Sequence, residues 1–201
     1  MKFFSDRTYR FLRALVLAVL RIAHPCVKVR GRENIPEGPV IFCCNHSAFT
    51  DPIWLVGHAN LPTMPRVMAK QELTRVPVVG WILGGLKIIP VDRDSSDLTA
   101  IKTSMKTLKE GNKMVIFPEG TRVRNGKESV AHIGAVMLSV RTNTKIMPCY
   151  LTANKRFFGK IDIVYGEPYL PQTSCPKPSN EELEQLSAKL LKTIYAMGEE
   201  L

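Results

Sequence analysis

Residues 40–59 read VIFCCNHSAFTDPIWLVGHA, which is an apolar run, a short polar cluster and a second apolar run. The first run, residues 40–44, is rich in the β-branched and aromatic side chains that favour a buried strand. Asp51 and Pro52 are typical of a helix N-cap and a first helical position, so residues 52–59 are predicted to form a short helix. The polar cluster is therefore expected where a central strand ends.

A second stretch repeats this arrangement. Residues 113–122 read KMVIFPEGTR, an apolar strand pattern followed by an acid, a glycine and an arginine. Further strands are predicted at 66–70, 87–91, 145–152 and 160–165. Helices are predicted from Ser96 to Gly111, over 130–141, and after a capping box of Ser179 and Glu182. This alternation predicts an α/β fold with a mostly parallel central sheet flanked by helices. Ligands bind at the carboxyl ends of such strands, so both polar clusters are expected at one site.

The N-terminal segment has a different pattern. Over residues 5–23 the apolar side chains recur with a helical period, and the arginines occupy the opposite arc. The longest uncharged apolar run has seven residues, far fewer than the roughly 20 that a spanning helix needs. Leu17 is the one large residue that does not fit. The predicted anchor residues are Phe11, Leu12, Leu15, Val16 and Val19 on the apolar arc, with Arg10 and Arg13 on the basic one.

Charge supports the same interpretation. The 201 residues carry a net charge of +10, and eight of the 28 basic residues fall within the first 32 positions. A basic amphipathic helix is typical of an anchor that lies at a membrane interface. We expect residues 1–30 to be a membrane-associating segment and 31–201 the α/β domain, attached peripherally or monotopically to the cytoplasmic face of the cell membrane. The alternatives are an ordinary helix packed on the domain and a cleaved signal peptide.

Composition also limits the other function classes. The basic charge is not accompanied by a nucleic-acid-binding motif. Five cysteines form an odd set without paired metal-ligand spacing, which favours free thiols in a reducing compartment. No cofactor and no metal are expected.

His46 and Asp51 are candidates for a base and its orienting acid. Five residues correspond to about 140° of rotation on a continuous helix, so the two side chains can meet only if residues 47–50 form a turn. Asp51 would then accept a hydrogen bond from one ring nitrogen and leave the other nitrogen to act as a base. The plainer alternative is that Asp51 only caps a helix.

The second cluster suits an anionic ligand. Gly120 allows a ligand to approach the backbone closely, and the planar guanidinium of Arg122 matches a phosphate group. Lys70 and Arg93 also follow predicted strands, so several cations are expected to converge at the same edge of the sheet. Backbone N–H groups near Gly120 or Ser47 are candidates for an oxyanion site.

Taken together, the motifs resemble those of the glycerolipid acyltransferases. They are Asn45-His46-x4-Asp51, Lys70-x-Glu72-Leu73 with Pro77 and Gly80, Ile89-x-Val91-x-Arg93, Phe117-Pro118-Glu119-Gly120-Thr121-Arg122, and Ile146-x-Pro148. The resemblance spans residues 31–167. It departs at His132, where relatives often have basic residues, and in showing one N-terminal amphipathic helix where some members have two.

The resemblance implies transfer of a fatty acyl group from acyl-CoA or acyl carrier protein to the sn-2 hydroxyl of 1-acyl-glycerol 3-phosphate. This reaction produces phosphatidic acid for phospholipid synthesis. It implies that His46 is the general base and that Asp51 orients it. The residues implied to hold or organise the phosphate of the acceptor are Lys70, Arg93, Glu119, Gly120, Thr121 and Arg122.

Several alternatives stay open at this stage. The acceptor could instead be glycerol 3-phosphate or another lysolipid. His46, Asp51 and Glu119 could ligate a divalent metal in a phosphoester hydrolase. A domain that only binds anionic lipids is the non-enzymatic alternative.

Overall fold

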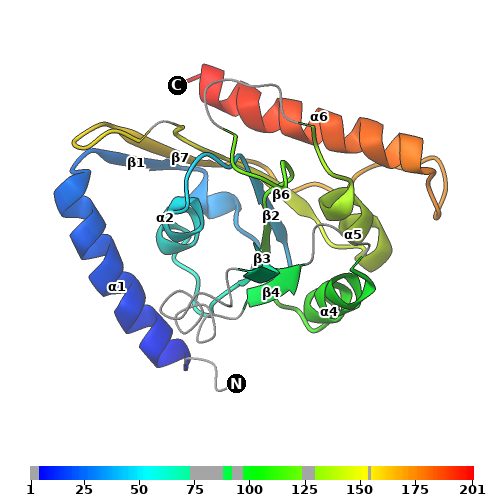
Figure 1. Ribbon diagram of the computed structural model, residues 1–201, viewed down its shortest axis with the longest axis horizontal. Helices are drawn as coiled ribbons and strands as arrows, with labels where there is room; N and C mark the ends of the chain where they lie inside the picture. The colour runs from blue at the N-terminus through cyan, green and yellow to red at the C-terminus, as the bar shows by residue number, and fades with distance from the viewer. Residues whose placement is uncertain (1–4, 73–87, 92–96, 124–129, 154) are drawn as a thin grey trace.

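A computed structural model describes residues 5–72, 88–91, 97–123, 130–153 and 155–201. Seven strands of the described residues form one sheet in the order β1-β7-β6-β2-β5-β3-β4 (Figure 1). All pairs are parallel except β6 with β7, which confirms the prediction of a mostly parallel sheet. The strands are β1 (Val27–Arg30), β2 (Ile41–Cys44), β3 (Arg66–Lys70), β4 (Ile88–Val91), β5 (Met114–Ile116), β6 (Ile146–Leu151) and β7 (Ile161–Tyr165).

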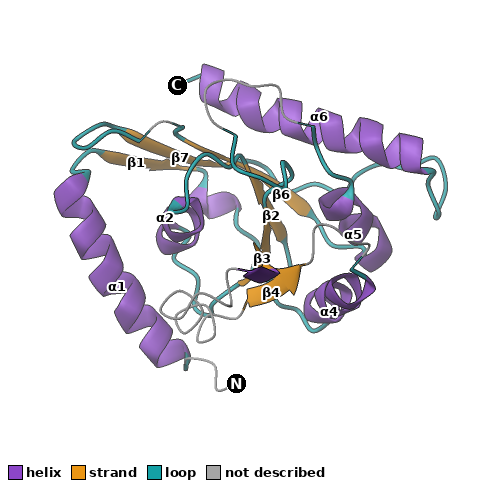
Figure 2. Cartoon of the chain, viewed as in Figure 1, coloured by secondary structure: helices purple, strands orange, loops and turns teal. Residues whose placement is uncertain are grey.

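Helices cover both faces of this sheet (Figure 2). Two separate apolar clusters mark the two faces: one includes residues of α1 and α2, and the other residues of α4, α5 and α6. The helices are α1 (Asp6–Ala23), α2 (Asp51–His58), α4 (Leu98–Lys109), α5 (Gly134–Thr142) and α6 (Asn180–Glu199), with a short 3-10 helix at Arg32–Asn34.

Strand β2 shows why the apolar run at its position is continuous. Phe42 and Cys44 belong to the cluster on one face of the sheet, and Ile41 and Cys43 to the cluster on the other. A central parallel strand is covered on both faces, so every position is buried. Beyond it, the buried Asn45 exchanges two hydrogen bonds of 2.9 Å with the backbone of Leu151, which fixes the end of β2 against β6.

Several predicted boundaries were wrong. β1 was not predicted, because four residues of alternating exposure give a weak signal; it pairs with β7 and so adds part of the N-terminal segment to the sheet. α5 begins at Gly134 instead of 130. The predicted capping box forms only in half: Ser179 is the N-cap of α6 and its hydroxyl accepts from the Glu182 N–H at 3.1 Å, but the Glu182 carboxylate accepts hydrogen bonds from Ser174. The apolar stretch 76–86 lies outside the described residues, as do Leu73, Pro77, Gly80 and Arg93.

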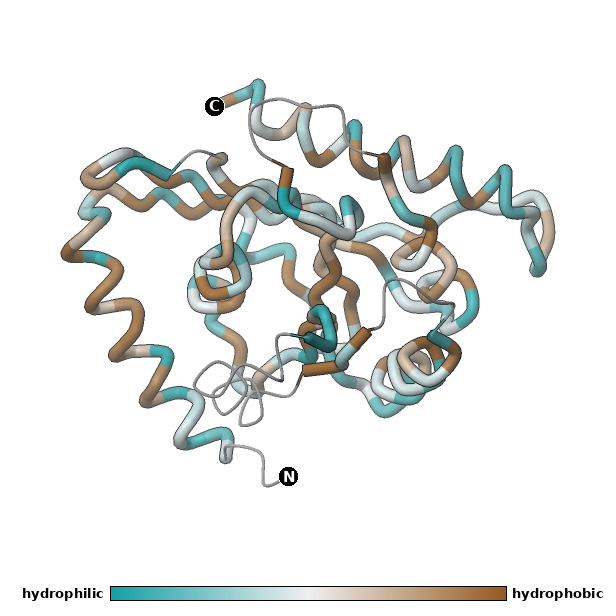
Figure 3. The backbone as a smooth tube through the Cα atoms, in the orientation of Figure 1, coloured by the Kyte–Doolittle hydropathy of each residue, from teal (hydrophilic) through white to brown (hydrophobic). Residues whose placement is uncertain are grey.

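Hydrophobic residues recur along helix α1 between hydrophilic ones (Figure 3), and most of the predicted apolar arc is exposed. Phe11, Leu15, Val19 and Ile22 are 53–77% exposed, whereas Tyr9 and Leu20 pack against the core. Leu17, the residue that did not fit the sequence pattern, faces Gly57 of α2 so closely that a Cβ there would lie 2.8 Å from a Leu17 methyl carbon. Leu17 thus falls outside the apolar arc because it packs α1 against α2.

Arg13 does not lie beside the exposed apolar residues. Its Nη2 donates a 2.7 Å hydrogen bond to the side-chain oxygen of Asn60, on the side of α1 that faces the domain. Arg10 is exposed, and Leu12 and Val16 lie at the border of the apolar arc. Within the described part of the chain, no helix combines the length and apolarity needed to cross a bilayer.

Candidate active site

His46 and Asp51 meet as the turn hypothesis requires. Residues 48–50 turn between β2 and α2, and Nδ1 of His46 lies 2.9 Å from Oδ2 of Asp51. A buried carboxylate accepts, so Nδ1 carries the proton and the lone pair is on Nε2. The His46 side chain is 13% exposed and that of Asp51 is fully buried. The pair therefore presents one basic nitrogen at the surface of the site.

Asp51 is not the helix N-cap that the sequence suggested. It is the first residue of α2, and its Oδ2 points back to accept from the backbone N–H groups of Ser47 (2.6 Å) and Ala48 (2.7 Å). The carboxylate thus closes the turn that carries His46. One acceptor atom both shapes the loop and holds the imidazole.

Lys155 is a further partner that sequence reasoning missed. Its ammonium donates to Oδ1 of Asp51 at 2.5 Å and to the hydroxyl of Ser47 at 3.2 Å, and its side chain is only 6% exposed. It follows β6, a strand adjacent to β2, more than one hundred residues along the chain. In the sequence Lys155 is one of two adjacent basic residues, with Arg156, and belongs to no recognisable motif, so only its place in the fold reveals its role.

The pKa of Asp51 reflects this environment. Burial raises the pKa of a carboxyl group, but the hydrogen bond from His46, the charge of Lys155 and the Ala48 amide together lower it below its ordinary value. Asp51 is therefore ionised at neutral pH and stabilises a proton on Nδ1 of His46. Its acceptor positions are taken by four donors.

Glu119 supports His46 from the other side. Its Oε2 accepts from the backbone N–H of His46 at 3.1 Å, and its Oε1 accepts from the Tyr195 hydroxyl at 2.5 Å. Tyr195 comes from α6, and no sequence signal linked it to the site. Burial raises the pKa of Glu119, and the hydrogen bonds from Tyr195 and His46 oppose this effect without cancelling it. Glu119 therefore holds the backbone N–H of His46 in place, and its carboxylate does not contact the ring nitrogens of His46 in this arrangement.

Aromatic rings flank the two clusters. The His46 ring stacks on Phe117 with centroids 4.1 Å apart. The Arg122 guanidinium lies 3.5 Å from the ring centroid of Phe49, and the backbone N–H of Val123 donates to the His46 carbonyl at 2.8 Å. The loop after β5 thus lies against the loop after β2, as the carboxyl ends of neighbouring parallel strands require.

Gly120 is required for two reasons. Its φ of +65° is in the left-handed region, and a Cβ at this position would lie 2.6 Å from the His132 ring. Thr121 is exposed beside it. A glycine at this position therefore lets the loop turn closely against the His132 ring.

Of the other two predicted cations, Lys70 and Arg93, the structure describes only Lys70. Lys70 ends β3, which neighbours β5, and its ammonium forms a 3.1 Å ion pair with Glu72. Arg93 lies outside the described residues. Of the three cations expected to converge, the structure places Arg122 over Phe49, in the loop that is hydrogen-bonded to the His46 carbonyl, and Lys70 at the carboxyl end of β3.

Backbone N–H groups near Gly120 or Ser47 stay candidates for the oxyanion site, but the N–H groups of these two residues themselves are already hydrogen-bonded. The Ser47 N–H donates to Asp51, and the Gly120 N–H donates to the carbonyl of Phe117 at 3.0 Å. Both groups are used in shaping their own turns, because short turns satisfy their N–H groups locally.

The cysteines near the site are buried thiols. Burial raises the pKa of both Cys43 and Cys44 far above the ordinary range, so neither supplies a thiolate. All five cysteines are free. Among the described residues, no cluster of three or more His, Cys, Asp or Glu side chains could hold a metal ion.

Comparisons with known proteins agree on one family. A family model described as Acyltransferase matches residues 26–152. The chain is 32% identical over 199 residues to the 1-acyl-sn-glycerol-3-phosphate acyltransferase of Bacillus subtilis (strain 168), covering 96% of this chain and 98% of that protein. It is 34% identical over 156 residues to the protein of the same name from Borreliella burgdorferi, covering 76% of this chain and 62% of the relative.

A solved structure gives the same result. The fold is similar to the crystal structure of the 1-acyl-sn-glycerophosphate (LPA) acyltransferase, PlsC, from Thermotoga maritima, with a TM-score of 0.67 and 27% identity. The match covers 88% of this chain and 72% of that one. Lys155 and Tyr195 lie outside the residues that the family model matches, which is why they carry no family signature.

Proposed function

The chain belongs to the acyltransferase family, and we propose that it transfers a fatty acyl group from an acyl thioester to the sn-2 hydroxyl of 1-acyl-glycerol 3-phosphate. The product is phosphatidic acid. The observation that carries the proposal is the 2.9 Å contact between Nδ1 of His46 and the buried Asp51, next to the loop of Arg122. The choice of 1-acyl-glycerol 3-phosphate as the acceptor rests on the names of the relatives given above.

In the proposed reaction His46 acts as a general base. Its Nε2 takes the proton of the sn-2 hydroxyl while that oxygen attacks the thioester carbonyl. The tetrahedral intermediate expels the donor's thiolate, and the proton on Nε2 passes to that sulfur. Asp51 stabilises the imidazolium in between, and Lys155 keeps Asp51 ionised. Hydroxyl and thioester become ester and thiol, so no enzyme nucleophile is needed.

The acceptor phosphate is proposed to lie against the loop after β5. Arg122 lies in the loop that is hydrogen-bonded to the backbone of His46, and its cation–π contact with Phe49 limits the positions that its guanidinium takes up. Lys70 and Arg93 are proposed as additional cations at this edge. Glu119, Gly120 and Thr121 then shape the loop instead of touching the phosphate with a positive group.

An assay with each donor tests this function. Purified protein in mixed micelles is given 1-acyl-glycerol 3-phosphate or glycerol 3-phosphate, with acyl-CoA or acyl carrier protein as donor, and the acylated product is measured. Phosphatidate formation from the lysolipid with at least one donor is expected. If neither acceptor is acylated with either donor, the proposed function is wrong, and a lipid-binding domain becomes the better explanation.

Helix α1 is proposed as the membrane-associating segment. Its exposed apolar arc continues onto the β6–β7 loop, where Phe157 and Phe158 are 81% and 72% exposed and the Phe158 N–H donates to the Ala23 carbonyl at 2.9 Å. Single exposed apolar residues are ordinary, but such a row on one side of the molecule marks an interaction surface. The acyl chains of the proposed substrate would lie in the same bilayer.

Replacing Ile22 with serine tests this surface. Ile22 is 77% exposed, and burying such a side chain in a bilayer contributes about 1.5–3 kcal/mol, so Ile22→Ser is expected to weaken vesicle binding roughly ten- to hundredfold. Leu98→Ser on α4, at a residue 63% exposed, is the matched control and should bind as before. Vesicle co-sedimentation measures both, and equal losses would argue against α1 as the anchor.

A further inference from the structure

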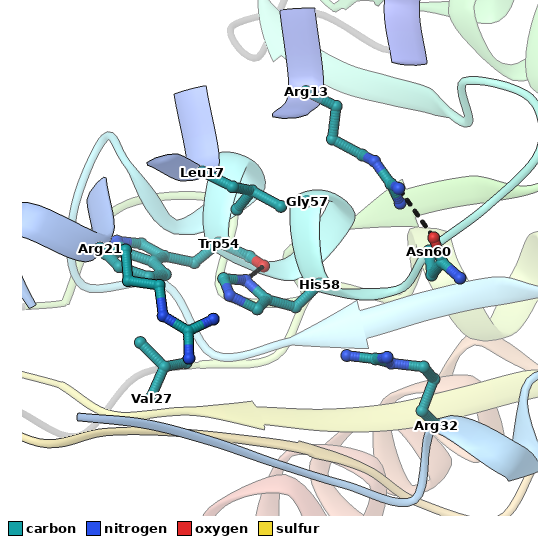
Figure 4. A pocket seen from close by; sticks show the side chains of 9 residues that line it. All are labelled: Arg13, Leu17, Arg21, Val27, Arg32, Trp54, Gly57, His58 and Asn60. Atoms are coloured by element: carbon teal, nitrogen blue, oxygen red, sulfur yellow. Dashed lines mark hydrogen bonds between the residues drawn. The ribbon is translucent and has the colours of Figure 1, made fainter. Parts of the chain in front are cut away.

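A cavity of about 290 Å³ lies between α1 and the C-terminal end of α2 (Figure 4). Its polar lining consists of Arg13 and Arg21 from α1, Arg32 after β1, and His58 and Asn60 at the end of α2. α2 begins at Asp51 in the candidate active site and ends at His58, so about 10 Å of helix separates the two places. The cavity is therefore distinct from the site of His46.

Positive charge in this cavity is unbalanced. Three guanidinium groups line it, and none of the described lining residues is an aspartate or glutamate. Figure 4 shows the side chains of Arg21 and Arg32 approaching the His58 ring from two sides. Burial lowers the pKa of His58, and the charges of Arg32, Arg21 and Arg13 lower it further against the hydrogen bond to the Trp54 carbonyl. Cations gathered in this way repel one another unless an anion lies between them.

Two of the three guanidinium nitrogens of Arg13 have no hydrogen-bond acceptor among the described residues. Its Nη2 donates to Asn60, but its buried Nε and Nη1 have no partner among the described residues. Buried donors are normally satisfied, and an unsatisfied one in a native fold calls for an explanation such as a bound ion or water. A ligand with several acceptor oxygens would meet this need.

We infer that this cavity binds a phosphate group, and that it is a second anion site between the membrane-facing helix and the domain. Guanidinium groups match phosphate oxygens in pairs, which favours phosphate over a simple halide. The volume is several times the roughly 30 Å³ share of one water molecule, so a phosphate and its residual hydration fit. The phosphate can come from the headgroup of an anionic lipid beside α1 or from free phosphate in solution.

Inorganic phosphate is the first probe. The His58 ring signal, assigned by its loss in His58→Gln, is followed by NMR as phosphate is added at constant ionic strength. A saturable shift of that signal, with a rise in the pKa of His58, is expected, because a bound anion offsets the three arginines. The measurement uses no acyl donor or acceptor, so it stands or fails independently of the proposed acyl transfer.

Two double variants with equal loss of charge make the test specific. Arg21→Gln with Arg32→Gln removes two groups from the cavity, and each lost charge-assisted contact weakens binding by about tenfold or more, so the combined loss is on the order of a hundredfold. Arg7→Gln with Arg30→Gln removes two exposed charges that do not line the cavity and should bind phosphate as the wild type does. Arg32→Gln alone leaves α1 unaltered and should show part of the loss.

Vesicles identify the source of the phosphate. The variants are compared on vesicles of phosphatidylcholine and of equal parts phosphatidylcholine and phosphatidylglycerol. If a headgroup is the ligand, the cavity variant loses selectivity for the anionic vesicles and the control variant keeps it. If free phosphate is the ligand, the cavity variant and the control variant differ only in the phosphate titration and show the same selectivity for anionic vesicles. Absence of a saturable His58 shift, or an equal shift in both double variants, overturns the inference.

Discussion

Replacing His46 with asparagine is expected to lower acyl transfer on the order of a thousandfold while leaving the fold intact. The asparagine Nδ2 occupies nearly the place of the imidazole Nδ1, so it still donates to Asp51 across the present 2.9 Å contact. The nitrogen that would take the substrate proton is absent, and a positioned base contributes about 10²–10⁴-fold to the rate. Steady-state kinetics should show the loss in kcat, with little change in KM, and circular dichroism should be unchanged.

Cys44→Ala is the companion variant for the His46 experiment. Cys44 is a fully buried thiol directly before Asn45 and His46, and it is the nearest rival for a covalent acyl intermediate. Because burial keeps this thiol protonated, the alanine variant should retain activity wherever it remains folded. Unchanged turnover in His46→Asn, or abolished turnover in a folded Cys44→Ala protein, would reverse the assignment of the base.

Asp51→Asn is expected to reduce both activity and stability. The equivalent change in a Ser-His-Asp triad lowers kcat about 10⁴-fold because the imidazole adopts the wrong tautomer, and a similar loss is expected here. Stability falls as well, because the Lys155 ammonium, 6% exposed, loses its only charged partner among the described residues. Removing one member of a buried ion pair costs about 3–5 kcal/mol. Chemical denaturation and the acyl transfer assay measure the two effects separately.

A second substitution separates these effects. Adding Lys155→Met to Asp51→Asn removes the unpaired ammonium and fills its place with an apolar chain, so stability should partly return. Activity should not return, since the imidazole still lacks its carboxylate. Recovery of activity in the double variant would mean that Asp51 acts only through folding.

The stability of Asp51→Asn relative to the wild type also depends on pH. The pKa of Asp51 is lower in the folded protein than its ordinary value of 3.8. Its ionised form therefore stabilises the fold fully above the unfolded-state pKa, and this contribution is lost as the pH falls through the folded-state pKa. The difference in unfolding free energy between wild type and Asp51→Asn should thus be constant near neutrality and shrink below about pH 4. A difference that grows in acid would contradict the ionised state.

The fold followed from short-range patterns. Residues 40–44 and 114–117 are continuous apolar runs, and a strand covered on both faces requires such runs whatever lies next to it. The turn between His46 and Asp51 was also predictable, because it is local and only a turn lets side chains five residues apart meet. The strand order and the pairing of β1 with β7 were not predictable, since they depend on contacts between residues far apart in the chain.

The sequence by itself determined the layered architecture, the chemical identity of the two clusters and the apolar arc of the N-terminal helix. Tertiary structure alone decided that Lys155 and Tyr195 reach the site and that Leu17 and Arg13 turn inward. The physical reason is range: periodicity and motif spacing describe a few neighbouring turns or strand residues. A buried ion pair or a helix docking contact forms between segments that only the folded chain brings together, and its members have no pattern of their own.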